Sequence, residues 1–128
     1  MMPVTCVQKA GKWDETYFMY IEDTEYALRM KAHGFRIVYV PTAKLWHKVS
    51  RSSGGLQNPK TIYYAIRNRL MLLNKYKNLH NVRIYNYLWI ALCQVRYVVF
   101  RKQMFRYTMR AVVDYYEGVT GRVSFDEK

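Results

Sequence analysis

The hydrophobic pattern of the first 57 residues mixes helical and extended segments. From Glu22 to His33 most residues are good helix formers, and Glu25 and Arg29 form an i,i+4 charge pair. Gly34 follows, at a position where glycine commonly ends a helix. Phe35–Val40 alternates apolar with other residues and contains β-branched side chains, which predicts a strand.

Shorter extended pieces are expected on either side of this helix and strand. Tyr17–Ile21 is a compact aromatic and β-branched run, and Lys44–His47 follows Pro41, which stops the preceding strand. Residues 1–12 are a weakly patterned lead-in, and Gly11 ends any helix they form. We therefore expect α/β character up to about residue 57.

The second half of the chain is predicted to be helical. Asn58 and Pro59 provide a helix cap and a proline in the first turn of a helix that runs to about Tyr76. Its apolar stripe consists of Ile62, Ile66, Leu70 and Leu73. Two further helices, at about 82–102 and 104–117, follow a break at residues 78–81 and end at Gly118 and Gly121.

These elements indicate two units in an α/β fold. Residues 1–78 form the first unit, and residues 79–128 form a basic, aromatic helical extension. The 128 residues suffice for one core but are few for a complete α/β enzyme. A hydrophobic fraction of 51% excludes a disordered chain.

The positive charge is concentrated in the middle of the chain. The formal net charge is +12, and residues 59–113 contain eleven Lys and Arg but no Asp or Glu. Such a block attracts anions such as phosphates, nucleic acid or an anionic membrane surface. The plainer explanation is that these basic side chains cover solvated helix exteriors, although such exteriors usually mix positive and negative residues.

Cysteines and apolar runs indicate the compartment. Cys6 and Cys93 have no metal-binding or redox spacing, which fits a reducing cytoplasm. The N-terminus shows no secretory signal pattern. No stretch reaches the roughly 18–20 uninterrupted apolar residues of a membrane span. We expect a cytoplasmic protein, with association at the inner face of the membrane as a hypothesis.

An acidic pair, Glu22 and Asp23, stands where the aromatic run becomes a helix. A carboxylate at a helix N-terminus stays ionised and is well placed to act as a general base. Asp is also a common helix cap, so the spacing alone leaves both roles open.

A histidine and a Ser/Gly loop follow the predicted strands. His47 at a strand end can bind metal or phosphate, and Ser50–Gly55 can be a lid or a phosphate-facing loop. A lone histidine more often binds neither, and Ser/Gly loops are usually plain connections.

Taken in order, these residues resemble a family 2 glycosyltransferase of the rhamnosyltransferase-like kind. The first matching segment is Gly11-x-Trp13-Asp14-Glu15-x-x-Phe18-Met19-Tyr20-x-Glu22-Asp23-x-Glu25-x-x-x-Arg29. Matching segments continue through Gly34–Pro41, Trp46–Lys48, Ser50–Gly55, Tyr63–Leu70 and Asp114-x-x-x-Gly118-x-x-Gly121. The resemblance is dense over residues 11–76 and loose beyond them.

The resemblance implies the C-terminal portion of a GT-A fold, with residues 1–78 as the acceptor-side half of the catalytic domain. Such enzymes move a sugar from a nucleotide-sugar donor to a hydroxyl of a glycan or lipid-linked acceptor, inverting the anomeric carbon. Carried over by position, Asp23 is the general base and Glu22 supports it. Cell-surface polysaccharide or glycan synthesis is the implied setting.

The resemblance also assigns binding residues. Trp13, Asp14 and Tyr20 line the acceptor side, and Arg67 pairs with a phosphate. His47 approaches the donor diphosphate or a divalent metal, Mg or Mn. The loop with Ser52 and Ser53 closes over the donor and excludes water.

The nucleotide-binding half of this family, with its D-x-D metal motif, is not found in these residues. We therefore expect a fragment or truncated reading frame that has little activity alone. The alternative class is a basic, aromatic module for nucleic acid or an anionic membrane, although no nucleic-acid-binding signature supports the former. The basic helices could also pack on the missing half or on a second copy of the chain.

Overall fold

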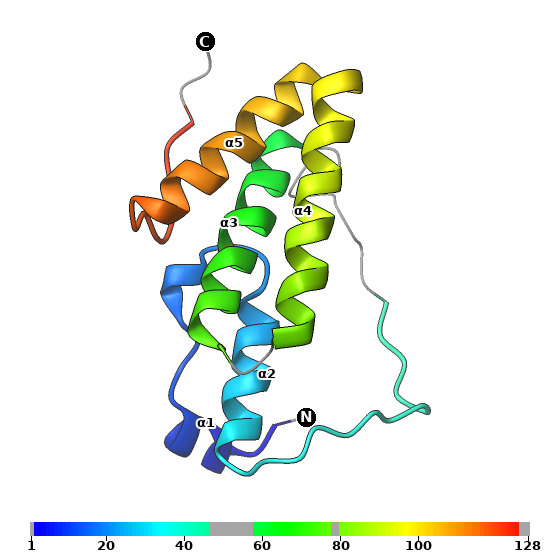
Figure 1. Cartoon of the computed structure of the whole chain (residues 1–128). Coiled ribbons are helices and arrows are strands. Elements are labelled where there is room, and N and C mark those ends of the chain that lie inside the picture. The colour runs from blue at the N-terminus through cyan, green and yellow to red at the C-terminus, as the bar shows by residue number, and fades with distance from the viewer. Residues whose placement is uncertain (1, 47–57, 78–79, 126–128) are drawn as a thin grey trace.

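The computed structural model describes residues 2–46, 58–77 and 80–125, and these residues form a helical assembly (Figure 1). The helices are α1 (Val4–Ala10), η1 (Glu15–Tyr17), α2 (Glu22–Ala32), α3 (Pro59–Lys75), α4 (His80–Phe100) and α5 (Lys102–Tyr116). The predicted helices of the second half are confirmed. Within the described residues there is no helix long and apolar enough to cross a membrane.

The prediction of an α/β fold is wrong, because none of the described residues forms a strand. Phe35–Val40, predicted as a strand, has no hydrogen-bonded neighbour strand in the described part of the chain. Phe35 is half-buried, but the side chains from Arg36 to Val40 are exposed, Tyr39 by 86%. An alternating pattern predicts a strand only where a second strand satisfies its N–H and C=O groups.

The region before α2 also differs from the prediction. Tyr17–Ile21 was expected to be extended, but Tyr17 ends the 3-10 helix η1. Tyr20 and Ile21 then take left-handed backbone conformations. Residues 1–12 have only a weak hydrophobic pattern, but they contain the helix α1. This helix ends at Gly11, as predicted.

Local sequence explains where the longer helices begin and end. The Asn58 side chain accepts a hydrogen bond from the Lys60 N–H at 2.9 Å, and Pro59 occupies the first turn of α3. In α2 the first turn is acidic and the last turn is basic, which complements the helix dipole. The predicted Glu25–Arg29 ion pair is present at 3.0 Å, and Gly34 follows the helix with φ of 83°.

A single core joins the two predicted units. α5 packs against α3 and, less extensively, against α4. The buried core cluster combines α3 residues with one residue each from α4 and α5: Tyr63, Tyr64, Ile66, Leu70, Ile90 and Ala111. Of the predicted α3 stripe, Ile66, Leu70 and Leu73 are buried. The helical extension beyond residue 78 therefore shares its core with α3.

Candidate active site

The predicted catalytic pair follows a turn with an unusual backbone. Tyr20 has φ of 65° and Ile21 has φ of 72°, immediately before α2 begins at Glu22. Side chains other than glycine rarely adopt this conformation, and a β-branched residue such as Ile21 does so at a cost. Such a turn persists only when its surroundings hold it.

Asn68 of α3 holds this turn. Its Nδ2 donates hydrogen bonds to the carbonyl oxygens of Met19 at 2.7 Å and Tyr20 at 3.0 Å. The side chain is fully buried, and its Oδ1 accepts hydrogen bonds from Nε and Nη2 of Arg67. The start of α2 is therefore fixed by a side chain almost fifty residues away in the sequence.

Arg67 belongs to the same buried network. Its guanidinium is fully buried and donates to the Gly121 carbonyl at 2.8 Å and to the Tyr63 hydroxyl at 3.3 Å. The Tyr63 hydroxyl in turn donates to Asp114 of α5 at 2.5 Å. Burial, followed by the bond to Asp114, raises the pKa of Tyr63 to about 12, although Arg67 opposes the shift. This network joins α3, α5 and the segment after α5.

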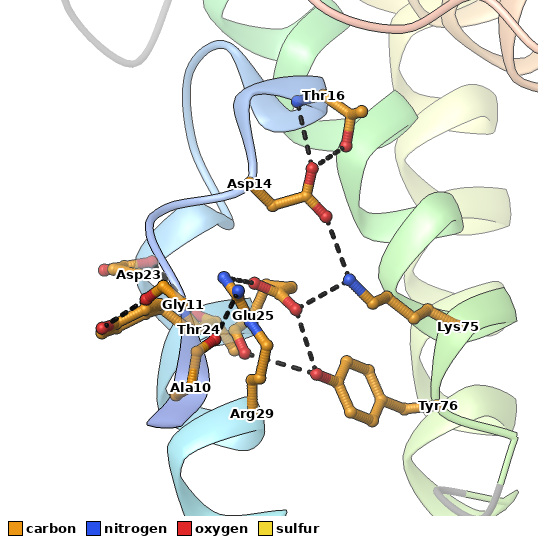
Figure 2. Close-up of polar contacts among 11 residues, drawn as sticks. Ala10, Gly11, Asp14, Thr16, Asp23, Thr24, Glu25, Arg29, Lys75 and Tyr76 are labelled. Carbon is orange, nitrogen blue, oxygen red and sulfur yellow. Dashed lines mark hydrogen bonds and ion pairs between the residues drawn. The ribbon is translucent and has the colours of Figure 1, made fainter. Parts of the chain in front are cut away.

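Asp23 itself is exposed at the first turn of α2. Its Oδ1 accepts hydrogen bonds from the N–H of Thr24 at 2.6 Å and from the Thr24 hydroxyl at 3.2 Å (Figure 2). The neighbouring Glu22 is half-buried, and its Oε2 is buried without a hydrogen-bond partner among the described atoms. Asp23 therefore presents its carboxylate to solvent, whereas one carboxylate oxygen of Glu22 is enclosed by the protein.

Trp13 packs against α2 through Tyr26. Its ring stacks on Tyr26 with the centroids 4.7 Å apart, and half of Trp13 remains exposed. Tyr26 is three residues after Asp23, so the two positions are neighbours on the helix surface. Trp13 and Asp23 thus bring an aromatic face and a carboxylate to one side of α2. Tyr20, also predicted on the acceptor side, is half-buried against the core.

Asp14 takes part in an ionic cluster that joins α2 and α3 (Figure 2). Lys75 of α3 contacts Asp14 at 3.0 Å and Glu25 at 2.9 Å. Glu25 is fully buried and also contacts Arg29 and the Tyr76 hydroxyl. Burial alone would raise the pKa of Asp14, but hydrogen bonds from Thr16 and Lys75 outweigh it and lower that pKa.

A cavity of about 590 Å³ opens beside the turn that precedes the acidic pair. Phe18 and Met19 form one side of it, and Lys60 and Arg122 bring positive charge. The remaining lining residues are Asn58, Thr61, Tyr64, Val123, Ser124 and Phe125. Glu22 and Asp23 do not line this cavity, so their carboxylates face a different part of the surface.

The predicted donor-side residues cannot be placed. His47, Ser52 and Ser53 lie outside the described residues. Within the described ranges, no three His, Cys, Asp or Glu side chains are grouped to hold a metal ion. The unpartnered Glu22 Oε2 is one oxygen suited to a divalent cation, but by itself it is not a site. The predicted divalent metal therefore stays a prediction.

Sequence reasoning missed the positioning roles of Asn68, Tyr63 and Asp114. Arg67 was interpreted as a phosphate partner, whereas the structure surrounds its guanidinium with protein groups. The available sequence signal for these roles was that two segments, Tyr63–Leu70 and Asp114–Gly121, match the family pattern. Nothing in their sequence showed that these two segments contact each other.

Comparison with known proteins establishes the class. Residues 1–70, more than half of the chain, match the family described as glycosyltransferase like family 2. The chain therefore belongs to this family, which confirms the resemblance seen in its motifs.

Two curated relatives show which members of the family the chain is similar to. Both are N-acetylglucosaminyl-diphospho-decaprenol L-rhamnosyltransferases of Mycobacterium tuberculosis, one from strain CDC 1551 / Oshkosh and one from strain ATCC 25618 / H37Rv. Each is 41% identical to this chain over 46 residues, which is 36% of the chain and 15% of the relative. The matched segment thus spans about a seventh of the length of these relatives. No solved structure shows a significant match.

Proposed function

We propose that this chain contributes the acceptor-side surface of an inverting glycosyltransferase, with Asp23 as its general base. Asp23 takes the proton of an acceptor hydroxyl while the hydroxyl oxygen bonds to the anomeric carbon of the donor. The bond from that carbon to the donor phosphate oxygen breaks, and the nucleoside diphosphate leaves. General-base catalysis of this kind contributes on the order of 10²- to 10⁴-fold.

The supporting observation is the exposed Asp23 carboxylate at the start of a helix whose entry turn is fixed from α3. Glu22 is placed to accept a hydrogen bond from the same acceptor. Half-exposed Trp13 offers a flat apolar face on which a sugar ring can rest.

The curated relatives support a substrate class. Their printed name describes transfer of L-rhamnose to a sugar carried on a polyprenyl diphosphate. We infer that the acceptor here is a lipid-linked glycan and that the donor is a nucleotide-linked sugar, in the synthesis of a cell-surface glycan. His47, Ser52, Ser53 and a divalent metal belong to the donor side of this proposal.

The test measures sugar transfer in an enzyme that contains this chain together with a nucleotide-sugar-binding part. Asp23→Asn should lower kcat at least about 100-fold while the KM for the donor changes little. Glu117→Gln is the matched control, because it removes the same charge from an exposed position at the end of α5, outside the proposed site. Transfer by Asp23→Asn at the rate of the control would remove Asp23 from the mechanism.

A further inference from the structure

The outward side of α4 is apolar. Five of its residues, spaced so that they share one side of the helix, are each at least half exposed: Ile84, Tyr85, Leu88, Leu92 and Val95. We refer to these residues as the α4 outer face. A contiguous exposed apolar patch of this kind marks a surface that meets a partner or a membrane.

The inward side of α4 is mixed in polarity. Ile90 is buried in the core, and the half-buried residues on the same side are Arg83, Asn86, Cys93, Gln94 and Tyr97. Gln94 Oε1 accepts a hydrogen bond from the Thr108 hydroxyl of α5 at 2.6 Å. A surface helix normally turns its apolar side to the core and its polar side to water. In α4, which lies along one side of the bundle, large apolar side chains also face outward (Figure 1).

Exposed cations lie near the C-terminal end of the α4 outer face. Arg96 follows Leu92 by one helical turn and is exposed, as are Lys102 and Arg106 at the start of α5. No Asp or Glu occurs from residue 59 to residue 113. Next to the face stand the exposed aromatic rings of Tyr87 and Trp89. Apolar side chains, interfacial aromatics and a cationic border together match the boundary between acyl chains and anionic head groups.

A second copy of the chain fits this surface less well. Two copies meeting through the α4 outer face would bring two identical cationic borders together, and each chain has a net charge of +12. Like charges facing each other across an interface oppose association. An anionic bilayer has the complementary charge and also accepts the apolar side chains.

We propose that the α4 outer face rests on an anionic lipid bilayer, with its apolar residues among the upper acyl chains and its cations at the head groups. This surface is separate from the proposed acceptor site on α2. The proposal therefore holds or fails independently of sugar transfer.

The test is flotation of the 128-residue chain with phosphatidylcholine vesicles and with vesicles that also contain phosphatidylglycerol. Binding should be stronger to the anionic vesicles and should weaken as salt is raised. Leu88→Ser/Leu92→Ser should weaken it at least about tenfold, because two inserted side chains are lost. Arg96→Gln should weaken binding to anionic vesicles about fivefold and leave binding to neutral vesicles unchanged.

The matched control is Val38→Ser/Tyr39→Ser, which removes equally exposed apolar side chains from a segment outside α4. This control should bind vesicles as the unaltered chain does. All of these positions are exposed, so circular dichroism should show unchanged helix content. The proposal is wrong if the chain binds neither vesicle, or if Leu88→Ser/Leu92→Ser and the control bind equally well. It is also wrong if the unaltered chain forms a dimer in solution that Leu88→Ser/Leu92→Ser dissociates.

Discussion

Replacing Asn68 with alanine should release the turn that begins α2. The side chain is fully buried and makes hydrogen bonds in two directions, to the carbonyl oxygens of Met19 and Tyr20 and from the guanidinium of Arg67. In Asn68→Ala the two carbonyls lose their donor, and Arg67 loses an acceptor. The left-handed conformations of Tyr20 and Ile21 then lack the contacts that hold them.

The expected loss of stability is large for a single substitution. Two neutral hydrogen bonds contribute about 1 kcal/mol each, and the two bonds from the charged guanidinium to the single Oδ1 are counted together as about 1.5–3 kcal/mol. The free energy of unfolding should therefore fall by about 3.5–5 kcal/mol, a substantial part of the roughly 5–15 kcal/mol typical of a domain. With a urea m value of about 2 kcal/mol per M, the unfolding midpoint falls by about 2 M.

Urea unfolding followed by circular dichroism measures this loss. Asn74→Ala is the matched control, because Asn74 is an exposed asparagine on the same helix. Asn68→Leu keeps the number and branching of the side-chain heavy atoms but provides neither donor nor acceptor, so it separates the hydrogen bonds from a cavity effect. Asn68→Leu should be nearly as unstable as Asn68→Ala. The reasoning is refuted if Asn68→Ala loses no more stability than Asn74→Ala, or if Asn68→Leu is as stable as the unaltered protein.

Two further predictions concern groups of the polar networks. The pKa of Asp14 is lowered from 3.8 in the folded state, so its contribution to stability is present above the unfolded pKa and is lost as the pH falls through the folded one. Between about pH 5 and pH 2, urea unfolding should therefore show a steeper loss of stability for the unaltered protein than for Asp14→Asn, and parallel losses would contradict this. Tyr63→Phe removes the hydrogen bond to Asp114 and should lower the free energy of unfolding by about 2 kcal/mol. Tyr116→Phe, at an exposed position of α5, should leave it unchanged, and equal effects of the two substitutions would argue against a stabilising bond to Asp114.

The motifs of this family serve different purposes in the structure. Glu22 and Asp23 present carboxylates at the surface, whereas Arg67 and Asn68 are buried and hold other segments in place. Two of these motifs meet because α3 runs past the turn before α2. A matching motif therefore indicates a family without showing which of its residues reach a substrate.

Local patterns were sufficient for the helices from α2 onward. The Asn58–Pro59 start and Gly34 after α2 act through contacts within a few residues, so they were readable from the sequence. The Glu25–Arg29 pair is local for the same reason, but the contacts of Glu25 with Lys75 and Tyr76 are not. Contacts between residues that are far apart in the chain produce no periodic pattern in the sequence, so they could not be predicted from it.

The sequence by itself determined the family, the order of the helices from α2 onward and the concentration of positive charge. Each of these depends on neighbouring residues or on composition. Only the tertiary structure decided that Phe35–Val40 is not a strand here, because a strand requires a partner that the described residues do not supply. It also decided that Asn68 supports the turn before Asp23 and that α4 exposes large apolar side chains, since burial depends on which elements pack together.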